Sequence, residues 1–144
     1  NLNVSVDGYI PDDYVESDYE KLELYQRLDK AKTMSELNSL KAEFDDYYGN
    51  LPEAILTLIE KRKLEILSHY SIIEDIKDSG KQLEIIFSPN AFETISGDKL
   101  FLLANRLFTK PAFKSLDNKI TIKINKHDQW LNRLNEFIET LSKQ

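Results

Sequence analysis

The sequence has no cysteine in its 144 residues, and it has only four glycines, four prolines and one tryptophan. The absence of cysteine excludes disulfide bonds, thiolate metal sites and a cysteine nucleophile, and it fits a protein of a reducing compartment. Uninterrupted apolar runs are only a few residues long, far short of the roughly 20 needed to span a bilayer. The segment Asn1 to Pro11 also lacks the basic flank and apolar stretch of a signal peptide. We therefore expect no membrane association.

Sequence motifs for catalysis and cofactor binding are also missing. The four glycines are scattered, so they form neither a G-x-x-x-x-G-K-[ST] phosphate loop nor a G-x-G-x-x-G fingerprint. The two histidines, His69 and His127, have no zinc-binding spacing, and no G-x-S-x-G nucleophile motif occurs. The sequence therefore predicts no catalytic residue, no cofactor site, no metal site and no ATP binding.

What the chain does have is an ordinary globular composition, with 41% hydrophobic and 31% charged residues. A domain of this length buries roughly two thirds of the surface that its unfolded chain exposes. The chain begins without methionine and inside a strand-like pattern. We therefore expect a folded domain that is a fragment of a longer protein.

Charge is unevenly distributed along the chain. Residues 1–60 hold 14 acidic and 5 basic side chains, a net charge of −9, whereas residues 61–144 hold 11 and 14, a net charge of +3. The acidic half would repel phosphate, which argues against a dedicated nucleic-acid-binding protein. Charge alone favours a solvated acidic face, and a basic protein surface is the expected partner if this half binds one.

The first segments predict one strand and one helix. Residues 1–6 alternate apolar and polar side chains, which predicts a half-buried strand that ends at Asp7. Ser17 and Glu20 have the spacing of a capping box. The helix after them is expected to bury a stripe of residues that recur at every third position, namely Tyr19, Leu22, Tyr25 and Leu28.

Two more helices follow in the acidic half. Thr33 and Glu36 form a second capping box, and Gly49 lies where a helix C-cap is expected. The apolar positions of this helix are Leu37, Leu40 and Phe44. Pro52 then starts a third helix, which is predicted to run to about His69.

The pattern changes after Tyr70. Residues 73–77 and 83–87 are short β-branched or aromatic runs around a turn, which predicts a hairpin. Helices are expected over 91–95 and 98–108, and a strand over 120–125. The last segment predicts an amphipathic helix from Trp130 to Leu141, with Trp130 as a large apolar contact.

These elements predict an α+β fold: a small sheet containing a hairpin, packed with several helices, in a single compact domain over residues 1–144. A weak boundary near Tyr70 separates a helical half, about 12–70, from a mixed half, about 71–144.

One set of exposed residues is a candidate partner interface. Glu43 and Asp46 are three positions apart, so a helix would place them on one face, and Tyr47 continues that patch towards Gly49. Spacing alone favours solvated surface residues. The functional interpretation is an anionic patch on a rigid helix that a cationic partner would neutralise.

Two other functions stay open from the residues alone. The first is a small acidic metal-dependent hydrolase that uses Asp12, Asp13 or Glu74 with His69. The second is a weak DNA-binding module in the basic half, where several lysines lie in or beside the strand predicted at 120–125. These lysines are Lys114, Lys119, Lys123 and Lys126.

Three ordered blocks resemble the C-terminal domain of bacterial transcription-repair coupling factors. They are VDGYIPDDYV at 6–15, LELYQRL at 22–28 and EFDDYYGNLPEAILTLIE at 43–60. The family commonly has Ala at the position of Gly8 and a basic residue at the position of Tyr47.

The resemblance implies one domain of a cytoplasmic, ATP-driven double-stranded DNA translocase that displaces stalled RNA polymerase at lesions and recruits the repair protein UvrA. It implies that this domain does no chemistry itself. Instead it packs on a module of the same protein that resembles the repair protein UvrB, and it masks the UvrA-binding surface there. Glu43 and Asp46 match acidic positions of that intramolecular interface.

Overall fold

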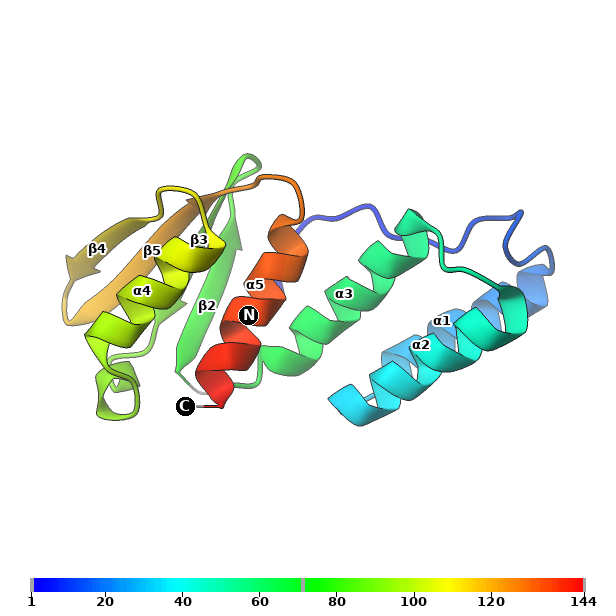
Figure 1. Cartoon of the computed structure of the whole chain (residues 1–144), viewed down its shortest axis with the longest axis horizontal. Coiled ribbons are helices and arrows are strands. Elements are labelled where there is room, and N and C mark those ends of the chain that lie inside the picture. The colour runs from blue at the N-terminus through cyan, green and yellow to red at the C-terminus, as the bar shows by residue number, and fades with distance from the viewer. Residues whose placement is uncertain (1, 71, 144) are drawn as a thin grey trace. The chain divides into compact units, whose positions relative to one another are not determined.

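The structure, a computed structural model, describes residues 2–70 and 72–143, except for the side chains of residues 2 and 3. Contacts divide the chain into two compact units (Figure 1). The helical unit is Val6–Ile66, and the sheet unit contains the described residues of 1–5 and 67–144. The sequence placed a weak boundary near Tyr70, and the chain enters the sheet unit at Leu67.

The helical unit contains α1 (Asp18–Lys30), α2 (Met34–Tyr48) and α3 (Glu53–Leu67), the last of which ends one residue beyond it. Both predicted capping boxes are confirmed as helix starts. The Ser17 hydroxyl accepts from the N–H of Glu20 at 3.3 Å, and the Thr33 hydroxyl accepts from that of Glu36 at 3.1 Å. Gly49 follows α2 with a φ of +99°, a conformation that favours glycine.

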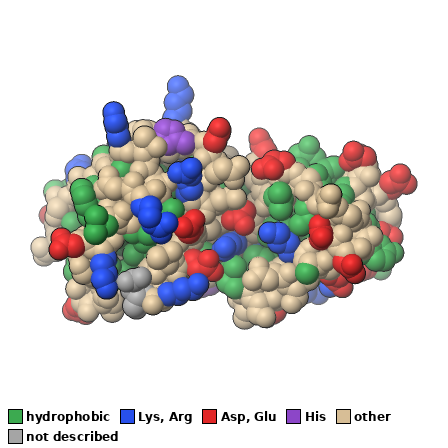
Figure 2. Space-filling view, in the orientation of Figure 1, with side chains coloured by type: hydrophobic (Ala, Val, Ile, Leu, Met, Phe, Trp, Pro, Cys, Tyr) green, Lys and Arg blue, Asp and Glu red, His purple; other side chains and the backbone are tan. Residues whose placement is uncertain are grey.

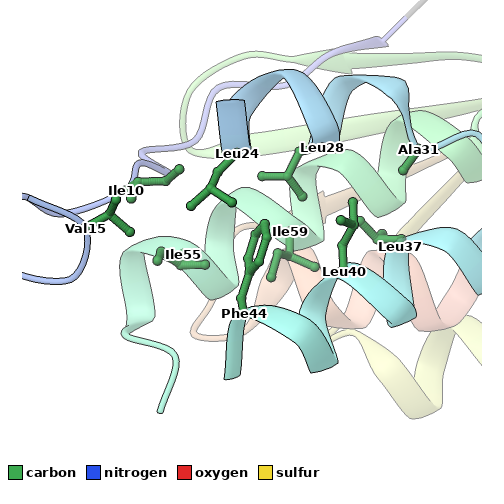
Figure 3. Packing of buried hydrophobic residues seen from close by; sticks show 10 residues of the cluster. All are labelled: Ile10, Val15, Leu24, Leu28, Ala31, Leu37, Leu40, Phe44, Ile55 and Ile59. Atoms are coloured by element: carbon green, nitrogen blue, oxygen red, sulfur yellow. The ribbon is translucent and has the colours of Figure 1, made fainter. Parts of the chain in front are cut away.

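The core of the helical unit is formed by apolar side chains from α1, α2, α3 and the segment before α1 (Figure 3). On α2 the predicted positions Leu37, Leu40 and Phe44 are buried. The stripe predicted for α1 is wrong in part. Leu28 is buried and Tyr25 is partly buried, but Tyr19 and Leu22 are 75% and 57% exposed, and the buried Leu24 was not predicted. Residues spaced by three drift about 60° around a helix at each step, so such a stripe leaves the core face.

The segment before α1 packs closely on the helices. The N–H of Tyr9 donates to the carbonyl of Ala54 at 3.1 Å, and the N–H of Ile10 donates to the Tyr25 hydroxyl at 2.8 Å. A Cβ atom at Gly8 would lie 2.6 Å from the backbone nitrogen of Leu58. Glycine therefore permits this close approach to α3. The family that the sequence resembles commonly has Ala at this position.

The sheet unit contains five described strands in the order β1-β2-β3-β5-β4. They are β1 (Leu2–Asn3), β2 (Ile73–Asp78), β3 (Gln82–Phe87), β4 (Ala112–Leu116) and β5 (Lys119–Asn125). The predicted β2–β3 hairpin and the strand β5 are confirmed, and with them the α+β class. The strand predicted over residues 1–6 is wrong in length: Asn1 lies outside the described residues, and β1 ends at Asn3, where its parallel pairing with β2 ends.

The sequence did not predict β4. It pairs antiparallel with β5 across Asp117 and Asn118, which both have positive φ, as tight hairpin turns require. All five residues of β4 are exposed. No alternation of buried and exposed positions therefore marks this strand in the sequence.

Helices α4 (Gly97–Leu107) and α5 (Trp130–Ser142) lie together on one face of the sheet (Figure 1). The short helix predicted at 91–95 is a 3-10 turn, Ala91–Glu93. Trp130, predicted as a large apolar contact, is the first residue of α5 and only half-buried, under the ammonium of Lys126 at 4.8 Å. None of the helices among the described residues is long and apolar enough to cross a membrane.

Asp78 connects three segments of the sheet unit. Its carboxylate accepts from the N–H of Ser5 at 2.8 Å, the N–H of Gly80 at 2.8 Å and the ammonium of Lys126 at 2.7 Å. Burial alone would raise the pKa of Asp78, but these hydrogen bonds and the positive charge of Lys126 hold the pKa below its usual value. The Asp78 carboxylate therefore connects the segment after β1, the β2–β3 turn and the end of β5.

Candidate interaction site on helices α1 and α2

The residues predicted as a partner interface lie on the last turns of α2. Asp46 and Tyr47 are exposed, and the side chain of Glu43 is 52% exposed. Glu43 and Tyr47 line one groove between α1 and α2, whereas Asp46 is not among its lining residues. A helix turns about 100° per residue, so Asp46 is displaced about 60° from Glu43, on the solvent side.

The groove has two depressions with volumes of about 430 and 470 Å³. Arg27 and Glu43 line both of them, so this pair separates the two. The depression near the end of α2 is lined mainly by aromatic and acidic residues: Tyr19, Glu20, Glu23, Tyr47 and Tyr48. The other is lined mainly by polar residues: Lys30, Ser35, Glu36 and Ser39. The surface is therefore an open groove with an aromatic, acidic end.

Glu43 is engaged within the helical unit. Its carboxylate forms an ion pair with the guanidinium of Arg27 on α1, and both side chains are partly exposed, at 52% and 40%. Pairs of this kind contribute about 1 kcal/mol or less, because water and salt screen them. A cation on a partner could therefore replace Arg27. Arg27 could not be predicted from the sequence, because nothing in the spacing of α1 shows that it faces α2.

Three tyrosines, Tyr19, Tyr47 and Tyr48, line the aromatic end of the groove. Tyr47 is 76% exposed and packs edge to face on Tyr48, with ring centroids 4.7 Å apart. The Tyr48 hydroxyl donates to Glu20 at 2.9 Å. Burial, that hydrogen bond and the negative charge of Glu20 raise the pKa of Tyr48 to about 12. Tyr48 therefore stays neutral at physiological pH and ties α2 to α1.

Tyr14 holds the end of α2 from the other side. Its hydroxyl lies 2.8 Å from the carbonyl of Gly49 and 3.1 Å from that of Phe44, and it donates to both. Its ring lies 5.5 Å from the ring of Tyr48. Burial, with a contribution from the charge of Asp45, raises the pKa of Tyr14. The Tyr14 hydroxyl thus holds the turn that carries Asp46 and Tyr47 by hydrogen bonds to its backbone carbonyls.

Two of the four residues considered for a hydrolase, Asp12 and Glu74, form ion pairs with lysines. Asp12 forms an ion pair with Lys21, and Glu74 accepts from Lys119 at 2.7 Å. Across residues 2–70 and 72–143, no group of three His, Asp or Glu side chains could hold a metal ion. The α1–α2 surface itself offers charge and aromatic area, which is the chemistry of a binding surface.

Charge also distinguishes the two units. Figure 2 shows acidic side chains gathered over the helical unit and basic side chains gathered over the sheet unit. Of the lysines considered for DNA binding, Lys119 pairs with Glu74 and Lys126 with Asp78, each at 2.7 Å. Two of the four charges are therefore already neutralised.

Comparisons with known proteins agree along most of the chain. The model of the TRCF domain family matches residues 4–97. A transcription-repair-coupling factor of Staphylococcus epidermidis is 29% identical over 140 residues, and those of Staphylococcus haemolyticus and Staphylococcus aureus are 28% identical. Each alignment covers 97% of this chain but 12% of the relative, so the chain spans only a small part of these proteins.

The fold is also shared with a solved structure. The crystal structure of the C-terminal domain of transcription-repair coupling factor matches with a TM-score of 0.74 at 18% sequence identity. The match covers 99% of this chain and 91% of that one. Both units, including the strand β4 that the sequence did not predict, therefore lie within the matched length.

Proposed function

Because this chain belongs to the TRCF domain family, we propose that it is a regulatory interaction domain of a transcription-repair coupling factor and does no chemistry itself. In this proposal its α1–α2 surface docks on a UvrB-like module of the same protein and masks the UvrA-binding surface of that module. The remainder of the protein would be an ATP-driven double-stranded DNA translocase of the cytoplasm. That translocase would displace stalled RNA polymerase at lesions and recruit UvrA.

The observation that carries the proposal is the aromatic, acidic end of the groove. A tyrosine that is 76% exposed, on a turn held by two other tyrosines, is large apolar area offered to solvent on a rigid support. Tyrosine and arginine are enriched at the centres of protein interfaces. The carboxylates of Glu43 and Asp46 would accept from arginine side chains of the partner, which bind carboxylates with two parallel hydrogen bonds.

The two carboxylates would have different parts in docking. Asp46 has no ion-pair partner among the described residues, so a partner cation could reach it without displacing anything. Glu43 already binds Arg27, so a partner arginine would have to replace that weak pair. We therefore expect Asp46 to contribute more to docking than Glu43.

The proposal is tested by measuring the affinity of this chain for the isolated UvrB-like module. Glu43→Gln/Asp46→Asn should weaken binding by at least tenfold, because each change leaves a partner cation unpaired in the interface. The controls are Asp45→Asn, which removes one charge from the same helix about 200° around the axis from Glu43, and the single variants Glu43→Gln and Asp46→Asn, which each remove one charge as well. Equal affinities for the double variant and Asp45→Asn would contradict the site. The absence of any binding by the unmodified chain would contradict the function.

A further inference from the structure

A second surface, in the sheet unit, is independent of the α1–α2 groove. The strand order places β4 at one edge, where β5 is its only partner among the described strands. In an antiparallel pair, alternate residues direct their N–H and C=O groups towards the partner and the others direct them away. The outward groups of β4 therefore form an edge that can accept another strand.

Apolar side chains lie beside this edge on the helix-covered face. Phe113 pairs in register with the buried Ile122, so it lies on that face, and its ring is 5.1 Å from the ring of Phe101 on α4. Phe101 is 53% exposed and Phe113 is 36% exposed. Figure 2 shows hydrophobic side chains exposed in the region of α4. An added strand would therefore meet apolar area here as well as backbone groups.

The opposite face of the edge carries one positive charge, Lys114, between the apolar side chains of Ala112 and Leu116, of which Leu116 is 61% exposed. Lys114 is the central residue of β4 and alternates with Phe113, so it lies on the face away from the helices. Lys114 and the preceding Lys110 are exposed, and no ion pair engages either of them within the part of the chain that the structure describes. A strand that adds here meets a positive charge at its centre.

This charge distinguishes between two possible occupants. A second copy that paired antiparallel about the centre of β4 would place Lys114 opposite Lys114, and like charges directly opposite each other destabilise a pair of strands. Lysine at a strand edge is a known means of preventing such self-association. An extended segment with acidic residues would instead gain an attractive cross-strand pair at the same position.

We propose that the free edge of β4 binds an extended segment of a partner polypeptide, which adds to the sheet as a further strand. The segment carries acidic residues on the face of Lys114 and apolar residues on the face of Phe101 and Phe113. Backbone hydrogen bonds supply much of the affinity, and the alternating side chains supply specificity, as in other cases of strand addition.

The probe is a capped peptide of about seven residues that alternates valine and glutamate, a length typical of strands. It is titrated into the isotope-labelled 144-residue chain, and amide chemical shifts are recorded by NMR. We expect shifts concentrated on Ala112–Leu116 and on Phe101. The same peptide with N-methyl groups at alternate residues should not bind, because it cannot donate along one edge. Equal binding of the methylated peptide would overturn the proposal.

Charge reversal tests the role of Lys114. Lys114→Glu should weaken binding of the glutamate peptide by about threefold to tenfold and strengthen binding of the matching lysine peptide, as replacing an attractive cross-strand pair by a repulsive one predicts. The control is Lys143→Glu, which reverses a charge at the C-terminal end of α5. Helix α4 lies between α5 and the β4 edge (Figure 1), so this change should not affect peptide binding. Two results would overturn the proposal: no binding at about 1 mM peptide, or dimerisation of the chain through β4 in sedimentation experiments.

Discussion

Removing the hydroxyl of Tyr14 should loosen the end of α2 without changing the core. In Tyr14→Phe the ring stays in place, and two carbonyls, of Phe44 and Gly49, lose a donor at 3.1 and 2.8 Å. A hydroxyl has one proton to share between them, and a net hydrogen bond contributes about 0.5 to 1.5 kcal/mol. We therefore expect the free energy of unfolding to fall by about 1 to 2 kcal/mol. For a chain of this length, that corresponds to a Tm lower by roughly 2 to 8 °C.

The assay is urea unfolding combined with amide hydrogen exchange. Exchange should accelerate at the N–H of Gly49, which donates to the carbonyl of Asp45 at 3.0 Å in the last turn of α2. Tyr19→Phe is the matched control, because Tyr19 is 75% exposed and its loss of a hydroxyl should change stability by less than about 0.5 kcal/mol. If the two variants are equally stable, water replaces the Tyr14 hydroxyl at no cost and our account of the α2 end is wrong.

Three further predictions concern stability. Trp130→Ala should cost about 1 to 2 kcal/mol in thermal unfolding rather than the 3 to 5 kcal/mol of a core aromatic residue, because Trp130 is half-buried; a larger loss would place it in the core. The lowered pKa of Asp78 stabilises the fold at pH values above the unfolded-state pKa of about 4, and this stability is lost as the pH falls through the folded-state pKa. Asp78→Asn should therefore make the free energy of unfolding depend less steeply on pH in acid, and an unchanged pH dependence would contradict this. The pKa of Tyr48 is raised to about 12, chiefly by burial and by the hydrogen bond to Glu20, so the unfolded chain loses its proton first and stability should fall between about pH 10 and pH 12; Tyr48→Phe should reduce that fall, and an unaltered fall would show that the pKa of Tyr48 is not raised in the folded chain.

The sequence predicted features that depend on neighbouring residues, and it missed those that depend on distant ones. The capping boxes at Ser17 and Thr33 are local hydrogen bonds within four residues, so spacing was sufficient to place both helix starts. β4 is defined by its pairing with β5, and its side chains are exposed on both faces, so its own residues show no period.

The candidate site was predictable to the same extent. Glu43 and Tyr47 are one helical turn apart, and their common face followed from the sequence. The ion pair with Arg27 and the hydrogen bond from Tyr48 to Glu20 join α1 to α2, so they exist only because the two helices pack together. Asp46 lies outside the groove because of which face of α2 is buried in the core, and this too depends on the packing of the helices.

The masking role is tested most directly by capture of UvrA by the full-length coupling factor. Our account predicts that the unmodified protein captures little UvrA, whereas Glu43→Gln/Asp46→Asn and a form without this domain both capture it in the absence of RNA polymerase. An interface that loses roughly 2 to 5 kcal/mol shifts a closed state towards an open one by a factor of ten or more. If only the deletion captures UvrA, the domain masks but these residues do not hold it; if neither does, masking is the wrong function for this chain.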